Sequence, residues 1–378
     1  MAKRTTYANG KSAPLIVLHV IETLSRGGAE RLLVVVIPEL ARQGMRAEVV
    51  VLRGPLDLQA ELKAEGISVH VLPKRGKWAL LGAARDLARL AKKRKADILH
   101  AHLYFPTLIT ALTKVLHLFN GVTHASFHNL AYGGANKRTW KLSLRQKIAK
   151  FLVLRGIDQP QGVSQASADH FAAAYGLKNI VVIHNAMDMR ILEGIDIPVG
   201  EAVVIPGRLV PEKGHLDVIA ALGLLRIPCP EVIFAGDGPL RSRLESEIRA
   251  ARLPITITGY LSYPEMLRTV ASARLVVIPS HYEGFGLTAL EALALGRPIV
   301  ASTAGGLPEV MGSLGYQVAP NDPSALAQAL ETALTNLNWR QEQEAAGTRQ
   351  AVQFSVRPIA ARQIALYQQS YNSKGVRR

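Results

Sequence analysis

Two glutamates, Glu283 and Glu291, lie on either side of a glycine-rich turn with seven residues between them. An apolar run at 275–278 precedes the turn, and a helix expected at 287–295 follows it and ends before Gly296. A glycine-rich turn from strand to helix lets backbone N–H groups and a helix N-terminus face an anion. A carboxylate on each side can accept hydrogen bonds from sugar hydroxyls. The segment therefore predicts a site for a phosphate that carries sugars.

The spacing of these glutamates resembles the EX7E motif of retaining glycosyltransferases of family 4, which have the GT-B fold. The later run Gly305-Gly306-Leu307-Pro308-Glu309 matches the same family. The resemblance implies that Glu291 holds the ribose hydroxyls of a nucleotide-sugar donor and that Glu283 holds hydroxyls of the donor sugar. Backbone N–H groups of the turn would face the donor phosphates. The donor-binding residues expected in the turn are Gly284, Phe285, Gly286 and Leu287.

A second phosphate-binding segment follows the apolar run 202–205 and contains Gly207, Arg208 and Lys213. An arginine can fork onto phosphate oxygens, and a lysine supplies a point charge. In the family the matching Arg and Lys bind the donor diphosphate, so the resemblance implies that they stabilise the nucleoside diphosphate as it leaves. The chain contains no Asp-x-Asp, and the dipole of the helix at Gly286 would help these cations to neutralise the phosphates. We therefore expect no metal and no cofactor; the nucleotide sugar is a substrate.

Further turns follow other expected strands. Gly27 and Gly28 open the first helix, where the family has a glycine-rich loop that meets the donor diphosphate and the acceptor. Gly236 lies in the strand-to-helix turn after the expected strand 232–235, where it is expected to line the nucleotide pocket. Tyr260 and Leu261 belong to the segment that in the family holds the nucleobase, largely through backbone groups, so all five residues are expected to bind the donor.

Histidines follow two expected strands of the N-terminal half. His128 ends one of them, and in relatives a histidine at that place points at the sugar being transferred. His102 and Asn129 are expected on the acceptor side. No cysteine or carboxylate at ligand spacing accompanies His100 and His102, so we expect no metal site there. The catalytic residues are thus expected to be Glu283, His128, Arg208 and Lys213.

Short apolar runs alternate with longer amphipathic ones along the chain, which predicts parallel sheets covered by helices on both faces. Strands are expected at 15–20, 47–52, 69–72, 98–101, 123–127, 202–205, 232–235, 255–258, 275–278 and 298–301. Helices are expected near 28–43, 57–65, 78–95, 105–117, 138–155, 214–227, 238–251, 262–273, 287–295 and 353–371.

Two such series in tandem, in a chain of 378 residues, predict an α/β protein of two facing Rossmann-like domains with a cleft between them, as in GT-B. The expected acceptor-side domain covers 1–190, and the nucleotide-sugar domain covers 191–352. The break is expected in 187–200, where glycines and a proline interrupt the pattern. By resemblance to GT-B proteins, the C-terminal helix within 353–378 would pack back on the first domain.

The net charge of +16 lies entirely in the N-terminal half: residues 1–190 hold 28 Lys+Arg against 12 Asp+Glu, whereas residues 191–378 hold 17 of each. The segments 74–95 and 137–155 concentrate the excess. A one-sided basic charge indicates a polyanionic partner, and an anionic membrane surface attracts nearby cations by about 1 kcal/mol each. Nucleic acid is disfavoured, because no nucleic-acid motif occurs and aromatic residues make up only 6%.

The second basic segment also carries an apolar stripe at helical spacing. We favour packing of this stripe into the domain core, with membrane binding as the alternative. The stripe consists of Trp140, Leu144, Ile148, Phe151 and Leu152.

The chain has no apolar run near the ~18 residues that span a membrane, and its single cysteine, Cys229, fits a reducing compartment. We expect that cysteine to be a small buried hydrophobe. The expected location is cytoplasmic, peripheral on the inner face of the cytoplasmic membrane.

These patterns predict a retaining transferase. It would move a hexose or N-acetylhexosamine from a nucleotide sugar, with UDP favoured, to a lipid-linked saccharide or a lipopolysaccharide or exopolysaccharide precursor. The resemblance implies front-side attack, with the departing phosphate oxygen taking the acceptor proton. No second carboxylate is arranged as a nucleophile in the manner of retaining hydrolases. A soluble acceptor and an inactive GT-B scaffold of polysaccharide assembly are the alternatives.

Overall fold

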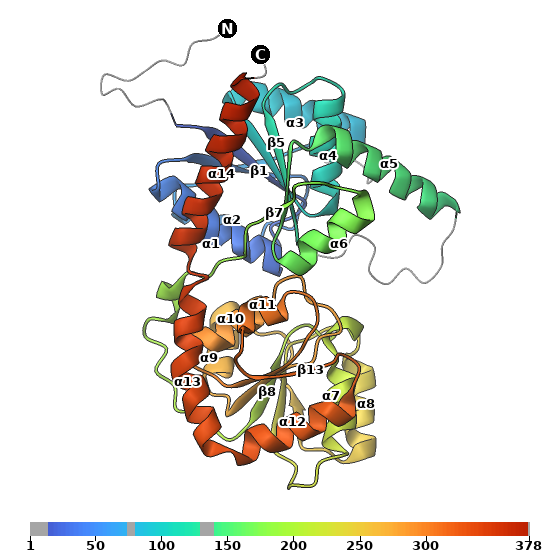
Figure 1. The fold of residues 1–378 in the computed structure, drawn as a ribbon, viewed down its shortest axis with the longest axis vertical. Coiled ribbons are helices and arrows are strands. Elements are labelled where there is room, and N and C mark those ends of the chain that lie inside the picture. The colour runs from blue at the N-terminus through green and yellow to red at the C-terminus, as the bar shows by residue number, and fades with distance from the viewer. Residues whose placement is uncertain (1–13, 74–79, 129–139, 377–378) are drawn as a thin grey trace. The chain divides into compact units, whose positions relative to one another are not determined.

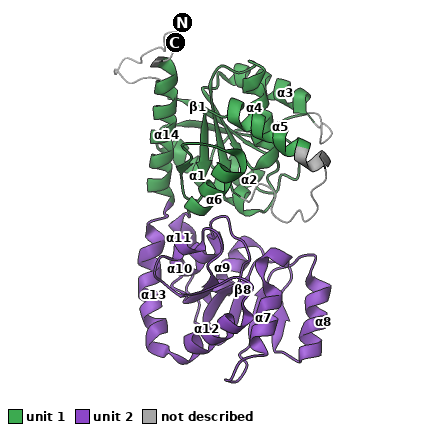
Figure 2. Cartoon of the chain, turned by 45° about the vertical axis from the view of Figure 1, so that its right-hand side comes forward, with its two compact units in different colours: residues 1–186, 356–378 green, residues 187–355 purple. Residues whose placement is uncertain are grey.

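The computed structural model describes residues 14–73, 80–128 and 140–376, without the side chains of 140–143 and 376. The chain forms two compact units (Figure 2). Unit 1 comprises Met1–Ala186 and Val356–Arg378, and unit 2 comprises Met187–Ser355. The chain therefore leaves unit 1 four residues earlier than the sequence suggested and returns to it with the last helix.

Unit 1 contains a seven-stranded parallel sheet in the order β3-β2-β1-β4-β5-β6-β7. Figure 1 labels β1, β5 and β7 of this sheet. Its strands are β1 (Ile16–Ile21), β2 (Arg46–Val51), β3 (Val69–Val71), β4 (Ile98–His102), β5 (Val122–Phe127), β6 (Gln159–Gly162) and β7 (Val181–Val182). Its helices are α1 (Gly28–Arg42), α2 (Gln59–Ala64), α3 (Leu80–Arg94), α4 (Tyr104–Val115), α5 (Trp140–Gly156), α6 (Gln165–Tyr175) and α14 (Val356–Val376).

Unit 2 contains a six-stranded parallel sheet in the order β10-β9-β8-β11-β12-β13. Its strands are β8 (Val203–Pro206), β9 (Val232–Ala235), β10 (Ile255–Ile257), β11 (Leu275–Ile278), β12 (Ile299–Ser302) and β13 (Tyr316–Val318). Its helices are α7 (His215–Leu222), α8 (Arg241–Ala251), α9 (Tyr263–Ala271), α10 (Leu287–Ala294), α11 (Leu307–Met311), α12 (Pro323–Thr335) and α13 (Leu337–Val352), with 3-10 turns η1 (Met189–Leu192) and η2 (Pro211–Lys213).

The inner strands form because a parallel sheet covered on both faces buries nearly all of their positions, whereas the edge strands β3 and β10 stay partly exposed. β11, with the sequence Leu-Val-Val-Ile, is buried at all four residues. The sequence pattern did not reveal β6, β7 or β13. β6 reads Gln-Pro-Gln-Gly, yet it lies inside the sheet between β5 and β7. Its two neighbours, rather than its own propensity, hold it extended.

The sheet of unit 1 also buries a polar layer beneath α14. His100 accepts or donates hydrogen bonds at both ring nitrogens, with the hydroxyls of Tyr367 on α14 and Ser126 on β5. His124 likewise contacts Ser370 on α14 and Gln161 on β6. The chain's return to unit 1 is therefore fixed by side-chain hydrogen bonds as well as by apolar packing.

Burial controls the protonation of this layer. It lowers the pKa of His19 and of His124 to about 3, and it lowers the pKa of His100 well below its usual value. All three imidazoles are consequently neutral in the folded protein at any pH near neutrality.

We expect the protein to lose stability as the pH falls from 7 to 5. Below pH 6.5 the unfolded chain protonates these histidines while the folded chain does not, so the free energy of unfolding falls by about 1 kcal/mol per pH unit for each of them. Thermal unfolding followed by circular dichroism at several pH values measures this slope. A His124→Asn variant should show a shallower slope, and an unchanged slope would contradict the assignment.

Candidate active site

The strand order of unit 2 reverses between β8 and β11, and in such sheets ligands bind at the carboxyl ends of the strands beside this point. The loops that follow β8 and β11 meet there. The amide of His281 donates to the carbonyl of Glu212, at 2.9 Å. A Cβ added to Gly214 would lie 2.1 Å from the carbonyl oxygen of Pro279, so only glycine permits this approach. The two segments that the sequence predicted to bind phosphate, after β8 and after β11, thus lie together at one edge of the sheet.

An ion pair joins these two loops. Lys213 Nζ lies 2.6 Å from Glu283 Oε2, and the two side chains are only 20% and 19% exposed. Ser280 Oγ donates to the same carboxylate oxygen at 3.3 Å. Lys213, which is predicted to bind the phosphate, and Glu283, which is predicted to bind the sugar, therefore already contact each other. Their contact fixes both side chains at one point of the sheet edge.

The helix after the turn presents its N-terminus at the same edge. Gly286 is the N-cap of α10 with φ of 106°, a conformation that favours glycine, and no side chain of the described residues caps this helix. The N–H groups of the first turn are thus available to an anion. Glu291, one turn further along α10, accepts a hydrogen bond from the hydroxyl of Tyr263 at 3.0 Å. This contact orients the second glutamate of the motif.

The Gly305-Gly306 segment supports the turn from behind. The amide of Gly306 donates to the carbonyl of Glu283 at 2.9 Å. A Cβ on Gly305 would lie 1.8 Å from that carbonyl oxygen, and a Cβ on Gly306 would lie 2.8 Å from Cα of Phe285. These glycines therefore position the backbone of the turn rather than contact a ligand themselves.

The remaining predicted residues of unit 2 follow neighbouring strands. Gly236, after β9, packs on Gly207, after β8; a Cβ at Gly236 would meet the Gly207 carbonyl oxygen at 2.1 Å. Arg208 is exposed, and no ion pair of Arg208 occurs in the described part of the chain. Tyr260, after β10, is 58% exposed, and Leu261 is half-buried beside it in sequence. Parallel strands thus bring all these positions to one edge.

Asp237 and Cys229 are two further side chains of unit 2 whose surroundings the structure defines. Asp237 does not cap α8; it accepts from the amide of Gly238 at 2.8 Å and pairs with Arg241. Cys229 is exposed, so the expectation of a buried cysteine was wrong. It lies in the connection between α7 and β9, which runs over the surface, so its apolar character did not lead to burial.

In unit 1, Gly27 is the N-cap of α1 and Gly28 is its first residue. The buried carboxylate of Glu30 reaches over Gly27; a Cβ at Gly27 would lie 2.4 Å from Glu30 Oε2. Thr23 and Ser25 donate hydroxyl hydrogen bonds to Glu30 at 3.0 and 2.9 Å. A carboxylate of the chain itself therefore lies at this helix N-terminus, held by two hydroxyl groups.

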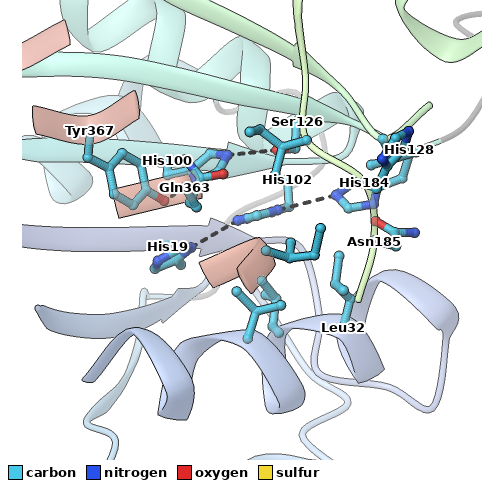
Figure 3. Close-up of a pocket in the computed structure, with 15 residues that line it drawn as sticks. His19, Leu32, His100, His102, Ser126, His128, His184, Asn185, Gln363 and Tyr367 are labelled. Carbon is cyan, nitrogen blue, oxygen red and sulfur yellow. Dashed lines mark hydrogen bonds between the residues drawn. The ribbon is translucent and has the colours of Figure 1, made fainter. Parts of the chain in front are cut away.

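The two predicted histidines of unit 1 line a pocket at the ends of β4 and β5 (Figure 3). His102 and His128 are 4% and 7% exposed, and His102 Nδ1 lies 3.2 Å from His128 Nε2. Asn129 lies outside the described residues.

Sequence reasoning missed His19 on β1, which contacts His102 in the same pocket. Only the pairing of β1 with β4 could have revealed His19 as a site residue, because it places His19 opposite His100 in the parallel register. One ring nitrogen from each of His19, His100 and His102 can be chosen so that all lie within 4.8 Å of one another. Both nitrogens of His100 already have hydroxyl partners, so this cluster is hydrogen-bonded without an ion.

Comparison with known proteins identifies the family. A model described as "Glycosyltransferase Family 4" matches residues 26–190, and one described as "Glycosyl transferases group 1" matches residues 197–350. The MMP alpha-(1->4)-mannosyltransferase of Mycolicibacterium hassiacum is 30% identical over 308 residues, which cover 77% of this chain and 74% of that protein. The chain therefore belongs to the family 4 glycosyltransferases, as its motifs predicted.

A second relative is matched over less of its length. The glycogen synthase of Mycobacterium tuberculosis is 32% identical over 274 residues, which cover 68% of this chain and 65% of the synthase. The chain thus aligns with just under two thirds of that protein.

Solved structures confirm the GT-B fold. Anabaena HepE in complex with UDP-glucose superposes with a TM-score of 0.79 at 22% identity, over 94% of this chain and 100% of that chain. A glycosyltransferase from Rickettsia africae gives a TM-score of 0.77 at 21% identity, over 94% and 98%.

Gly305→Ala tests the support of the turn. The added methyl clashes with the Glu283 carbonyl, and the residue has φ of +57°, so we expect a loss of about 1–3 kcal/mol in the free energy of unfolding in urea. Gly194→Ala is the control, because Gly194 has φ of +80° but nothing within 4 Å of an added Cβ. Equal losses in both variants would show that backbone strain alone, and not this contact, matters.

Proposed function

We propose that the protein is a retaining hexosyltransferase that uses a nucleotide sugar and acts at a membrane surface on a lipid-linked saccharide or a lipopolysaccharide or exopolysaccharide precursor. The proposed use of a nucleotide sugar rests on the groups at the carboxyl edge of the sheet in unit 2. The strand order reverses there between β8 and β11, and beside this point lie Lys213, Glu283 and the uncapped N-terminus of α10. A cation and a helix N-terminus suit a diphosphate, and carboxylates suit sugar hydroxyls.

The proposed reaction breaks the bond between C1 of the donor sugar and the phosphate oxygen and forms a bond from C1 to an acceptor oxygen on the same face. The acceptor proton passes to the departing phosphate oxygen. Lys213 and Arg208 stabilise the charge on that phosphate, and no divalent metal takes part. His128 contributes a polar contact to the sugar that is transferred.

Relatives support the choice of donor class. HepE was solved with UDP-glucose, and a Mycobacterium tuberculosis relative that is 38% identical over 133 residues is named as a GDP-mannose-dependent mannosyltransferase. A nucleoside diphosphate is common to both. We assign UDP first, and a panel with both nucleotides decides between them.

Lys213→Met should lower kcat/KM at least about 100-fold, because the departing diphosphate loses a fixed positive charge. Glu212→Gln is the matched control: it is exposed on the neighbouring position, and its substitution should change kcat/KM less than about twofold. Steady-state rates with EDTA present measure both effects. A Lys213→Met enzyme as fast as the wild type would contradict the assigned role.

Membrane attachment is supported by α5. Leu144, Ile148 and Phe151 are 50%, 51% and 54% exposed, and at 3.6 residues per turn they fall within roughly 60° of the helix circumference. The expectation that this stripe packs into the core was therefore wrong for these three residues, whereas Leu152 is buried as expected. The helix has a separate buried side, with Val153 fully enclosed.

The physical reason for this outcome lies in the close packing of α5 on α4. A Cβ on Gly156 would lie 2.3 Å from the carbonyl oxygen of Ala111, so small residues let the two backbones approach. Ala149, Leu152 and Val153 fill that contact, which leaves the opposite side to solvent.

Exposed cations flank the apolar side of α5, namely Arg145, Lys147 and Arg155, and the helix contains no acidic residue. Apolar side chains among cations are typical of a helix that lies in the interface of an anionic membrane. No helix of the described residues is long and apolar enough to cross a bilayer. The names of some similar proteins support a lipid acceptor: WaaG is described as involved in lipopolysaccharide biosynthesis, and one mannosyltransferase as acting on phosphatidylinositol dimannoside.

Sedimentation with vesicles of phosphatidylcholine and phosphatidylglycerol tests the attachment. Replacing Leu144, Ile148 and Phe151 together by serine should weaken binding at least tenfold, since each buried apolar side chain contributes roughly 1.5–3 kcal/mol. The control replaces three equally exposed apolar residues elsewhere, Leu224, Leu337 and Val352, by serine. Equal binding of the two variants, or no binding of the wild type, would leave a soluble acceptor as the better hypothesis.

A further inference from the structure

Three imidazoles form a continuous chain in the pocket of unit 1. His19 Nδ1 lies 3.1 Å from His102 Nε2, and His102 Nδ1 lies 3.2 Å from His128 Nε2. All three side chains are buried, with exposures of 1%, 4% and 7%. Figure 3 shows the two contacts in line, from β1 through β4 to the end of β5. Both separations fit N–H···N hydrogen bonds.

Such a chain has a direction. A neutral imidazole has one N–H and one acceptor nitrogen, so each ring that donates at one nitrogen accepts at the other. Burial keeps the rings neutral: it lowers the pKa of His19 to about 3, that of His128 to about 4 and that of His102 well below its usual value. Only two arrangements remain. Either every Nδ1 carries the proton, or every Nε2 does.

The ends of the chain decide between the two arrangements. Within the described residues, His19 Nε2 and His128 Nδ1 have no partner, nor do two amide atoms that line the same pocket, Gln363 Nε2 and Asn185 Oδ1. Figure 3 places Gln363 toward the His19 end and Asn185 toward the His128 end. The donor Gln363 Nε2 complements an acceptor at His19, and the acceptor Asn185 Oδ1 complements a donor at His128. The opposite arrangement would leave two donors, His19 Nε2 and Gln363 Nε2, at one end of the pocket and two acceptors, His128 Nδ1 and Asn185 Oδ1, at the other, so neither pair could form a hydrogen bond.

We propose that His19 and His102 are positioning residues that hold His128 in the tautomer with the proton on Nδ1. His128 then offers a hydrogen-bond donor to an oxygen of the transferred sugar, and its Nε2 is occupied by His102. It does not act as a general base. The catalytic meaning of this assignment rests on the proposed function of His128, whereas the tautomer itself does not.

The tautomer is measured directly by long-range 1H–15N NMR of the full-length protein labelled at histidine, without any donor. We expect the proton on Nδ1 of His128 in the wild type, and a mixture of tautomers in His19→Leu. His19→Asn places an amide N–H near the position of Nδ1 and should restore the wild-type pattern. A wild-type His128 protonated at Nε2 would overturn the proposal.

Kinetics connect the tautomer to the reaction. His19→Leu should lower kcat about tenfold with KM for the donor within about twofold, and His19→Asn should recover most of the rate. His124→Asn is the control for a merely structural effect, because His124 is equally buried in the same sheet but bonds to Gln161 and Ser370 outside the chain. An equal loss of kcat in His124→Asn would overturn the positioning role.

Two further results distinguish a failure of the proposed role of His128 from a failure of the proposed hydrogen-bonded chain. A His128→Gln enzyme with wild-type rates would remove the proposed role of His128 while the NMR result stands. Stoichiometric zinc, copper or nickel in the purified wild type that is lost in His19→Leu would overturn the proposal, because the short N···N contacts would then be pairs of metal ligands.

Discussion

The contact between Lys213 and Glu283 is the interaction on which the candidate site of unit 2 depends. It joins the loop after β8 to the loop after β11, across the point where the strand order reverses. Both groups are about four-fifths buried, so water screens their attraction less than on an open surface. A charged pair in such a place needs a rigid support, and the glycines at 214, 305 and 306 give it by letting backbones approach where a Cβ would clash.

Much of this arrangement follows from the sequence. Uninterrupted apolar strands such as β9 and β11 were predicted with their observed bounds, because a short apolar run bounded by turn residues suits a strand that is covered on both faces. Once the strands are parallel, the residues after them must share an edge. Gly207, Arg208, Lys213 and Glu283 could therefore be assigned to one region of the sheet, although their roles stay predictions until tested.

Other features depend on tertiary contacts that no local pattern carries. β6 is polar and contains Pro160, and only its neighbours make it a strand. His19 has no motif around it, and its contact with His102 exists because β1 pairs with β4. The stripe on α5 was assigned to the core because helical spacing shows that apolar residues share a side, but it does not show which side packs. The small contact at Gly156 and Ala111 determined that.

Unit 1 has ordinary apolar cores, and it departs from the usual pattern in two places: it buries a layer of histidine rings, and it exposes apolar side chains on α5. A buried layer of histidines is tolerated because hydrogen bonds satisfy most of its nitrogens. Exposed Leu144, Ile148 and Phe151 have no such compensation in water. Large exposed apolar patches mark interaction sites, and the surrounding cations suit an anionic surface. Both departures concern the half of the chain that carries the whole net charge.

The most direct test of the account is a transfer assay. Purified protein is mixed with labelled UDP- and GDP-sugars and an anionic membrane extract, with EDTA present. The account predicts that label moves into the organic phase, with retained anomeric configuration in the product. Failure of every donor to transfer its sugar, together with no binding of any donor by calorimetry, would contradict it.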